Sequence, residues 1–317
     1  MLPRGAWILE ALGLIAVLAL VFYRVRASRG ALVLAREGLG RRIVVRDRGA
    51  FRELVFTSAD GAVEMLQASV SRDALVSGIP YTDGLHIAAL VAPRLERALF
   101  LGGGPLLVPR QFLELYPGVR VTVVEIDPAV VEVARDHFSV VPGPRLSIEI
   151  GDGRDALMAS AEGSFDVIVV DAFGVGTTPR RLASAPFFAL CRERLRPGGC
   201  LVVNLAGALV GPGSVLLRRV HAGIVEAFGA ASVVAFGVPS ADGQETDLAS
   251  ADNTIVIAQR GAPSAPAEAL AARAAGLPRA MLPYLDAILA LRFDASAEGI
   301  VPLADPLHGQ DDVLVLW

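Results

Sequence analysis

The sequence predicts an α/β domain with a mainly parallel sheet, preceded by a small antiparallel β-domain and one membrane-spanning helix. Three observations support this prediction. Short apolar segments alternate with amphipathic helical segments from residue 97 to residue 259, which is typical of parallel strands covered on both faces. Short runs of alternating polar and apolar residues precede them, and a nearly unbroken apolar run lies close to the start of the sequence.

The composition excludes several classes of function. Of the 317 residues, 53% are hydrophobic, which is enough for a sizeable core. The 29 basic residues are all arginine, which excludes a lysine Schiff base and a lysine-dependent phosphate loop. The net charge of −4 comes without a basic cluster, so we expect no nucleic-acid partner.

Cysteine and histidine show no metal-site pattern. Cys191 and Cys200 have no Cys or His nearby at metal-ligand spacing, and we expect both to be small core residues. The histidines have no mutual spacing suited to a metal or a catalytic triad; they are His86, His137, His221 and His308. We therefore predict no metal.

The apolar run over residues 5–23 predicts a transmembrane helix with Trp7 and Tyr23 at the two interfaces. Its one charge, Glu10, lies near one end, where the apolar side chains offset its cost. Arginines follow the run at positions 24, 26, 29 and 36, and Arg4 precedes it. This bias predicts a single-pass protein of the cell inner membrane with a cytoplasmic catalytic domain. A cleaved secretory signal and a buried core helix are the alternatives.

The rest of the chain divides into three parts. Alternating residues from Ile43 to Gln67, with turns at 48–50 and 59–61, predict the small antiparallel sheet. A helical stretch at 82–91 and then the α/β domain follow. We place the boundaries at 1–30 for the membrane helix, 31–80 for the β-domain, 81–261 for the α/β domain, and 262–317 for a linker or capping helix and C-terminal extension.

The first two strands of the α/β domain end in residues suited to a nucleoside. Residues 97–101 lead directly into Gly102, Gly103 and Gly104, where backbone without side chains can approach a ligand. The second strand ends at Glu125, about twenty residues further on, where a carboxylate can accept both ribose hydroxyls. Asp127 either joins this site or caps the helix that Pro128 opens.

The third and fourth strands add two more carboxylates at the same edge. Asp152 and Gly153 follow the strand ending at Ile150; Asp152 either accepts from the exocyclic amine of an adenine or caps the next helix. Asp171 ends the apolar run FDVIVVD and faces the crevice formed by the preceding strand ends. A carboxylate at the end of an apolar run costs free energy of folding unless it has a role, so Asp171 is the catalytic candidate.

Five segments together resemble the spermidine synthase family, in its order and at its spacing: LFLGGG, VVEIDP, GDGRDAL, FDVIVVDAF and LRPGGCLVVNL. The resemblance covers residues 43–260 and implies a Rossmann-like, S-adenosylmethionine-dependent methyltransferase fold behind a small β-domain. It also implies aminopropyl transfer from decarboxylated S-adenosylmethionine to a small-molecule amine. A homodimer is left open.

The resemblance also implies roles for individual residues. Glu125 would hold the ribose, and Asp152 with Gly153 would hold the adenine. The loop of Gly102, Gly103 and Gly104 would hold the sulfonium arm, and Asp171 would accept a proton from the attacking amine. Gln67 and Tyr81 would line the pocket for the aminopropyl group and the acceptor.

Two positions depart from the family pattern. Pro105 and Gly174 stand where the family usually has aspartates that help to hold a polyamine. The acceptor and the transferred group are therefore open. One alternative is a methyltransferase that uses S-adenosylmethionine on a small or membrane-proximal acceptor. The other is a protein that binds the nucleoside without turnover.

Overall fold

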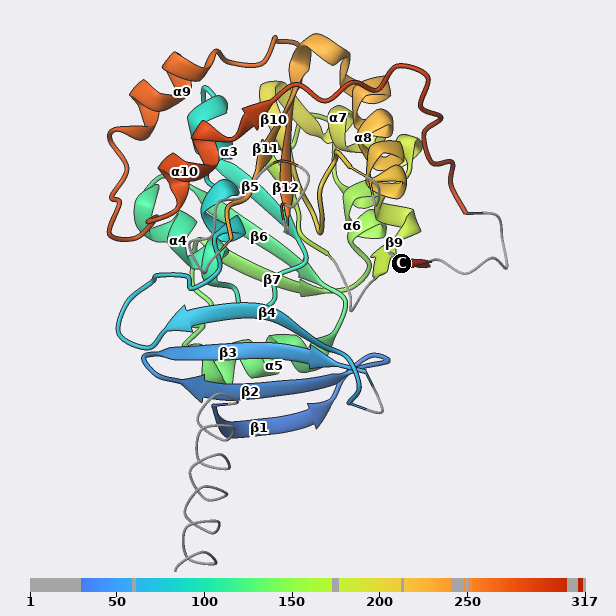
Figure 1. Ribbon diagram of the computed structural model, residues 1–317. Coiled ribbons are helices and arrows are strands. Elements are labelled where there is room, and N and C mark those ends of the chain that lie inside the picture. The colour runs from blue at the N-terminus through green and yellow to red at the C-terminus, as the bar shows by residue number, and fades with distance from the viewer. Residues whose placement is uncertain are drawn as a thin grey trace, which may run out of the picture.

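The computed structural model describes residues 30–58, 61–172, 177–211, 214–240, 248, 251, 253–306 and 313–315. The predicted transmembrane run at 5–23 lies outside this part of the chain. Within the described ranges, no helix combines the length and the hydropathy needed to cross a bilayer. The described strands form an antiparallel four-stranded sheet, an eight-stranded sheet and a two-stranded ribbon (Figure 1).

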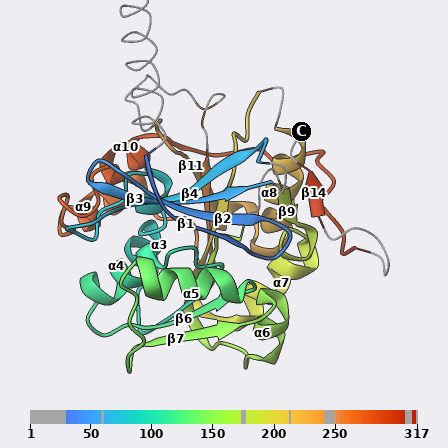
Figure 2. The ribbon, with the colours of Figure 1, turned by 90° about the horizontal axis from the view of Figure 1, so that it is seen from below.

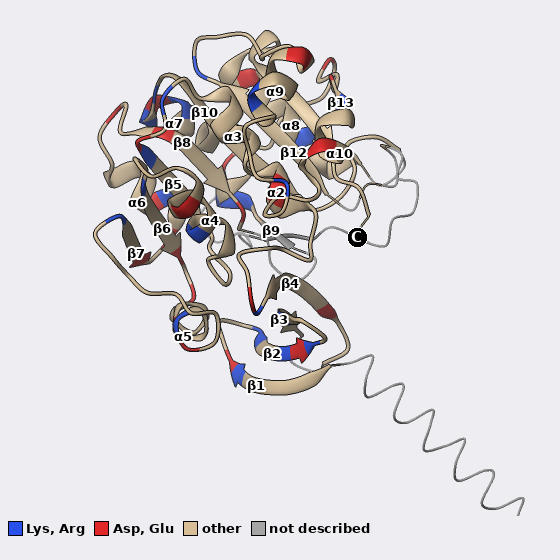
Figure 3. Ribbon diagram, turned by 90° about the vertical axis from the view of Figure 1, so that its left-hand side faces the viewer, with Lys and Arg blue, Asp and Glu red and all other residues tan. Residues whose placement is uncertain are grey.

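The predicted β-domain is a four-stranded antiparallel meander, with each strand paired to the next. Its strands are β1 (Ala31–Glu37), β2 (Arg42–Arg48), β3 (Phe51–Thr57) and β4 (Glu64–Ser71). Alternation along β2 and β3 buries Ile43, Val45 and Leu54 on one face. The sheet begins at Ala31, earlier than the pattern from Ile43 predicts. Figures 1 and 3 show β4 as the strand nearest the α/β domain.

The eight-stranded sheet confirms the prediction of a mainly parallel α/β domain. Its order is β13-β11-β12-β10-β8-β5-β6-β7, and β10, β8, β5, β6 and β7 are parallel neighbours. The strands are β5 (Arg97–Leu101), β6 (Arg120–Glu125), β7 (Leu146–Ile150), β8 (Phe165–Val170), β10 (Leu195–Leu205), β11 (Val233–Gly237), β12 (Thr254–Gln259) and β13 (Arg292–Phe293). β12 pairs antiparallel with both β10 and β11.

Helices cover both faces of this sheet (Figure 2). They are α2 (Tyr81–Gly84), α3 (Ile87–Val91), α4 (Leu107–Leu115), α5 (Pro128–His137), α6 (Gly153–Ala159), α7 (Ala185–Arg194), α8 (Val215–Phe228), α9 (Ala267–Ala274) and α10 (Leu285–Ala290). Phe100 packs with α3, α4 and α5, whereas its neighbours Leu99 and Leu101 pack with α6, α7 and α8. Successive side chains on a strand point to opposite faces, so apolar runs such as β5 fill two cores.

The C-terminal extension packs against the α/β domain. Leu270 of α9 and Leu285 of α10 join the core that contains Phe100, and β13 adds an edge strand beside β11. Leu303 is buried in the core on the opposite face. Further along, β14 (Val313–Val315) pairs antiparallel with β9 (Thr177–Pro179) in a separate two-stranded ribbon.

Candidate active site

The turn after β5 brings its backbone against the end of β8. Gly102 has φ +87°, and a Cβ there would lie 2.2 Å from the carbonyl oxygen of Asp171. The Gly102 N–H donates to the Val124 carbonyl, and the Asp171 N–H donates to the Leu101 carbonyl. Only glycine permits this backbone conformation and this approach, so Gly102 is required here by the packing of the β5 turn against Asp171, and contact between this turn and a ligand stays a prediction.

Glu125 is held rigidly at the end of β6. Its side chain is buried, with Oε2 accepting from the Gly103 N–H at 3.1 Å and Oε1 accepting from the Asp127 N–H at 3.1 Å. Burial raises the pKa of the Glu125 carboxyl, while these two hydrogen bonds and the Arg41 guanidinium oppose the rise. Each carboxylate oxygen is thus anchored in place and retains lone pairs for a ligand.

Asp127 adopts the capping arrangement. Its Oδ1 accepts from the Ala129 N–H at 2.9 Å at the start of α5. Its Oδ2 accepts from the Leu39 N–H at 2.8 Å, and Nε of Arg41 lies 4.0 Å from the same oxygen. The turn between β1 and β2 is therefore docked on the N-terminus of α5, and the guanidinium of Arg41 stacks 3.9 Å from the centre of the Phe56 ring.

Asp152 caps a helix and lines a cavity at the same time. Its Oδ1 accepts from the Arg154 N–H at 2.8 Å and from the Asp155 N–H at 3.1 Å at the start of α6. Neither bond uses Oδ2. The two alternatives for Asp152 are therefore compatible, because a capping carboxylate has a second oxygen that can meet a ligand.

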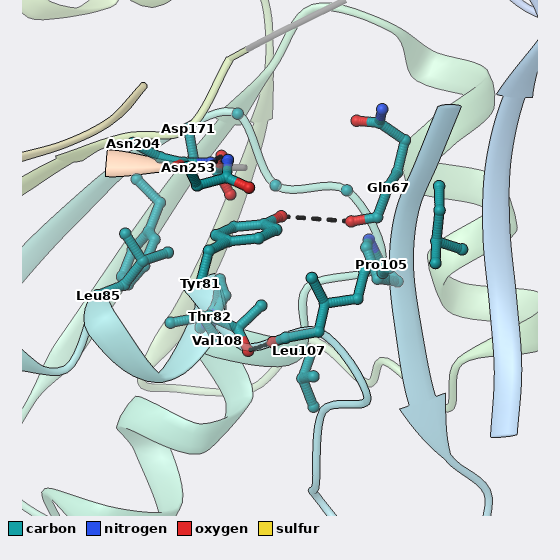
Figure 4. A pocket seen from close by; sticks show the side chains of 18 of the residues that line it. Gln67, Tyr81, Thr82, Leu85, Pro105, Leu107, Val108, Asp171, Asn204 and Asn253 are labelled. Atoms are coloured by element: carbon teal, nitrogen blue, oxygen red, sulfur yellow. Dashed lines mark hydrogen bonds between the residues drawn. The ribbon is translucent and has the colours of Figure 1, made fainter. Parts of the chain in front are cut away.

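Asp171, at the end of β8, is the centre of a polar network (Figure 4). Its Oδ1 accepts from Asn204 Nδ2 at 2.9 Å, and Asn204 Oδ1 accepts from Asn253 Nδ2 at 3.0 Å. The Tyr81 hydroxyl donates to the main-chain carbonyl oxygen of Gln67 at 3.2 Å. Burial raises the pKa of Asp171, and the hydrogen bond from Asn204 opposes the rise. Burial and Asp171 hold the pKa of Tyr81 well above its ordinary value, so Tyr81 remains a proton donor.

Two neighbouring cavities are both lined by Asp171. The acidic cavity, about 360 Å³, is lined by Glu125, Asp152 and Asp171 together with Arg41 and Arg181. The amide cavity, about 260 Å³, is lined by Gln67, Asn204 and Asn253 with Tyr81 and several apolar side chains. Both cavities are bordered by the same four residues: Gln67, Gly102, Gly104 and Asp171. The structure thus brings together the residues that the sequence singled out at four strand ends.

Three further residues belong to this site and were not found from the sequence. Asn204 lies in the apolar run LVVNL, so the reasoning applied to Asp171 applies to it equally. Asn253 precedes β12, and Arg41 lies between β1 and β2; neither has a local signal. Of the two departures from the family pattern, Pro105 lines the amide cavity, and Gly174 lies outside the described residues.

The described histidines and cysteines do not enter the site. His86 is buried beside Gln111 and Tyr116, and burial lowers the pKa of His86 to about 4. Cys191 and Cys200 are fully buried, as expected of core residues. Across the described ranges, no group of three His, Cys, Asp or Glu is arranged to hold a metal ion.

The fold and the site define a Rossmann-like α/β protein with an acidic binding site at the carboxyl edge of its parallel strands. Residues 82–255, more than half of the chain, match the model of the spermine/spermidine synthase domain. The chain therefore belongs to the spermine/spermidine synthase family.

The chain is also similar to individual proteins of two activities. A probable polyamine aminopropyl transferase of Bifidobacterium longum is 32% identical over 180 residues, covering 57% of this chain and 39% of that protein. Putrescine N-methyltransferase 1 of Nicotiana tabacum is 33% identical over 128 residues, covering 38% of this chain and 34% of that protein. The chain thus spans well under half the length of these two relatives.

A solved structure shares the fold. The crystal structure of a probable spermidine synthase from Corynebacterium glutamicum superposes with a TM-score of 0.67 at 22% identity, covering 88% of this chain and 98% of that one. Because 88% of this chain is covered, the likeness extends beyond the α/β domain.

Proposed function

We propose that this protein transfers an aminopropyl group from decarboxylated S-adenosylmethionine to an amine acceptor. The observation that carries the proposal is that Asp171 lines two neighbouring cavities, one suited to a nucleoside and one to an acceptor. Family membership and the similarity to a probable polyamine aminopropyl transferase support the same chemistry.

The acidic cavity suits the nucleoside part of the donor. Glu125 is positioned to accept hydrogen bonds from the two ribose hydroxyls, as acidic residues at this strand end do in nucleoside-binding folds. Asp152, on the next strand end, borders the same cavity and suits the adenine amine. The sulfonium arm then passes Gly102 and Gly104 toward the amide cavity.

The reaction needs alignment and one proton acceptor. The lone pair of the acceptor nitrogen attacks the carbon bonded to sulfur, a C–N bond forms, and the C–S bond breaks with its electrons going to sulfur. Methylthioadenosine leaves as a neutral thioether, and the new ammonium gives its proton to Asp171. A buried carboxylate with a raised pKa is a better base than an exposed one, and its charge also stabilises the donor cation.

Methyl transfer is the second candidate, favoured by the match to the Nicotiana methyltransferase. S-adenosylmethionine carries a carboxylate that the decarboxylated donor lacks. Asp171 would repel that carboxylate, and none of the described residues lining the amide cavity is cationic. This charge distribution favours the decarboxylated donor.

Product analysis tests the proposal. The full chain, in detergent, is incubated with each nucleoside and a panel of amines. Methylthioadenosine together with an aminopropylated amine supports the proposal. S-adenosylhomocysteine from the carboxylated donor supports methyl transfer instead, and binding without product supports a non-catalytic role. Asp171→Asn should abolish most turnover, whereas the same change at the exposed Asp136 should not.

Attachment to the inner membrane, with the catalytic domain in the cytoplasm, is part of the same proposal. Its support is the apolar run at 5–23 with arginines after it. Membrane fractionation with alkaline washing tests the attachment, and protease access in inverted and right-side-out vesicles tests the orientation. Recovery of the chain in the wash would contradict the proposal.

A further inference from the structure

A cavity lined by arginines lies outside the site described above. It has a volume of about 410 Å³ and lies where the end of β4 and the segment after it meet α4 and the end of α5. We call it the arginine cavity. Its basic lining residues are Arg52, Arg72, Arg110 and His137, and its other polar residues are Ser71, Asp73 and Ser139. All of these residues belong to the part of the chain that the structure describes.

Two of the arginines share one carboxylate. Arg52 donates from Nε and Nη2 to the two carboxylate oxygens of Asp47, at 2.7 and 2.9 Å, and from Nη1 to the main-chain carbonyl of His137. Nη1 of Arg72 lies 3.7 Å from Oδ2 of the same Asp47. The side chain of Arg52 is therefore fixed, whereas that of Arg72 is 49% exposed and can turn toward a ligand.

Arg110 has no carboxylate of this kind. Its Nη1 donates to the main-chain carbonyl of Phe138 at 2.6 Å, and among the described residues this bond is its one polar contact. The side chain is half-buried, and burial lowers the pKa of Arg110 with no described carboxylate opposing the change. An arginine nevertheless stays charged at neutral pH. Its Nε and Nη2 are thus charged donors at the cavity wall, and an anion would satisfy them.

The end of α5 does not cancel this positive charge. A helix C-terminus is equivalent to about half a negative elementary charge, which its last carbonyls carry. Two carbonyls at the end of α5 already accept from Arg52 and Arg110. The charges of three arginines against the carboxylates of Asp47 and the exposed Asp73 leave the surroundings of the cavity net positive.

We infer that the arginine cavity binds a phosphate group. The N–H groups of a guanidinium match phosphate oxygens, and a phosphate can accept from more than one arginine because its oxygens point in different directions. Arg110 supplies the unused donors, and Arg72 and the hydroxyl of Ser139 belong to the same lining. Asp171 is not among the lining residues, so the inference does not depend on which group the enzyme transfers.

The phosphate has two sources, a free phosphate or phosphate ester and the headgroup of a lipid. The lipid source follows from the position of Gly30, since a Cβ there would lie 2.8 Å from the carbonyl oxygen of Asp47. Residues 24–30 extend at most about 25 Å. With the run at 5–23 in the bilayer, as proposed above, lipid headgroups are within reach of the cavity.

Titration with inorganic phosphate tests the inference. Calorimetry is carried out on the full chain in detergent and phosphate-free buffer, and we expect saturable binding. Arg110→Gln should raise the Kd about 10-fold or more. Arg120→Gln is the matched control and should leave the Kd unchanged, because Arg120 is exposed and does not line the cavity. A cooperative thermal transition without phosphate shows that each variant is folded, and Arg72→Gln, at the exposed side chain, gives a second reading in the same direction.

Two results would overturn the inference. One is the absence of saturable binding by wild type up to about 10 mM phosphate, and the other is an equal Kd in Arg110→Gln and Arg120→Gln. Nanodiscs then distinguish the two sources. If phosphatidic acid in the disc raises the Kd of wild type for inorganic phosphate relative to phosphatidylcholine alone, and does not do so in Arg110→Gln, the occupant is a lipid headgroup. An unchanged Kd in wild type identifies a free phosphate or phosphate ester.

Discussion

Asn204 donates a hydrogen bond of 2.9 Å from Nδ2 to Oδ1 of Asp171. The amide comes from β10 and the carboxylate from the end of β8, and these two strands are parallel neighbours in the sheet. Because Asn253 donates in turn to Asn204, the amide plane of Asn204 is fixed with its nitrogen toward Asp171. Asn204 is thus the positioning residue for the proposed base.

Replacing Asn204 with leucine should shift the pH dependence of the reaction. The hydrogen bond from Asn204 lowers the pKa of Asp171 against the effect of burial. Without it the pKa rises further, so the ionised base is lost at a higher pH and the acidic limb of kcat/KM moves upward. We expect turnover to fall about 10-fold at neutral pH. An unchanged acidic limb in the pH profile would contradict this role.

Glu125→Gln should weaken binding of the nucleoside. The change removes the negative charge and turns an NH₂ group toward the N–H of Gly103 or of Asp127, where an acceptor is needed. We expect the Kd for methylthioadenosine to rise about 10- to 100-fold, measured by calorimetry on the full chain. The exposed Glu149 at the end of β7 provides the matched control, since Glu149→Gln removes the same charge away from the cavity.

Asp83 should make stability depend on pH. Burial raises the pKa of its carboxyl from 3.8 to about 7. Between these values the folded protein binds a proton that the unfolded chain has lost, so the free energy of unfolding falls as pH rises. The loss attributable to Asp83 should reach about 2 to 4 kcal/mol. Urea unfolding of wild type and Asp83→Asn at several pH values measures the contribution of Asp83. If the free energy of unfolding depends on pH in the same way in the two proteins, Asp83 does not make this contribution.

Asp305 should anchor the C-terminal extension to the first turn of α6. Its two oxygens accept from Arg154 at 2.6 and 2.7 Å, and Ser184 donates to it. Because the pair is partly exposed, Asp305→Asn should lower the free energy of unfolding by about 1 kcal/mol. Asp155→Asn, in the exposed pair with Arg181, should cost less. Equal losses in the two variants would count against an anchoring role.

Part of the site could be predicted because its signals are local. Gly102 and Asp171 follow directly after buried apolar strands, Glu125 is the last residue of β6, and Asp152 comes two residues after β7. Parallel strands present their carboxyl ends at one edge of the sheet. Asn253 could not be found in this way, because it precedes an antiparallel strand and reaches the same edge from the opposite direction. Arg41 could not be found either, since its place depends on how the β-domain docks on α5.

By itself the sequence determined the α/β class, the antiparallel β-domain and the acidic strand ends, because periodicity and strand-terminal residues are properties of short segments. Tertiary structure alone decided that Asp127 caps α5, that Asn204 orients Asp171, and that residues 262–306 pack into the core. Each of these depends on distances between segments far apart in the chain, which are set by strand order and by the packing of helices on both faces of the sheet.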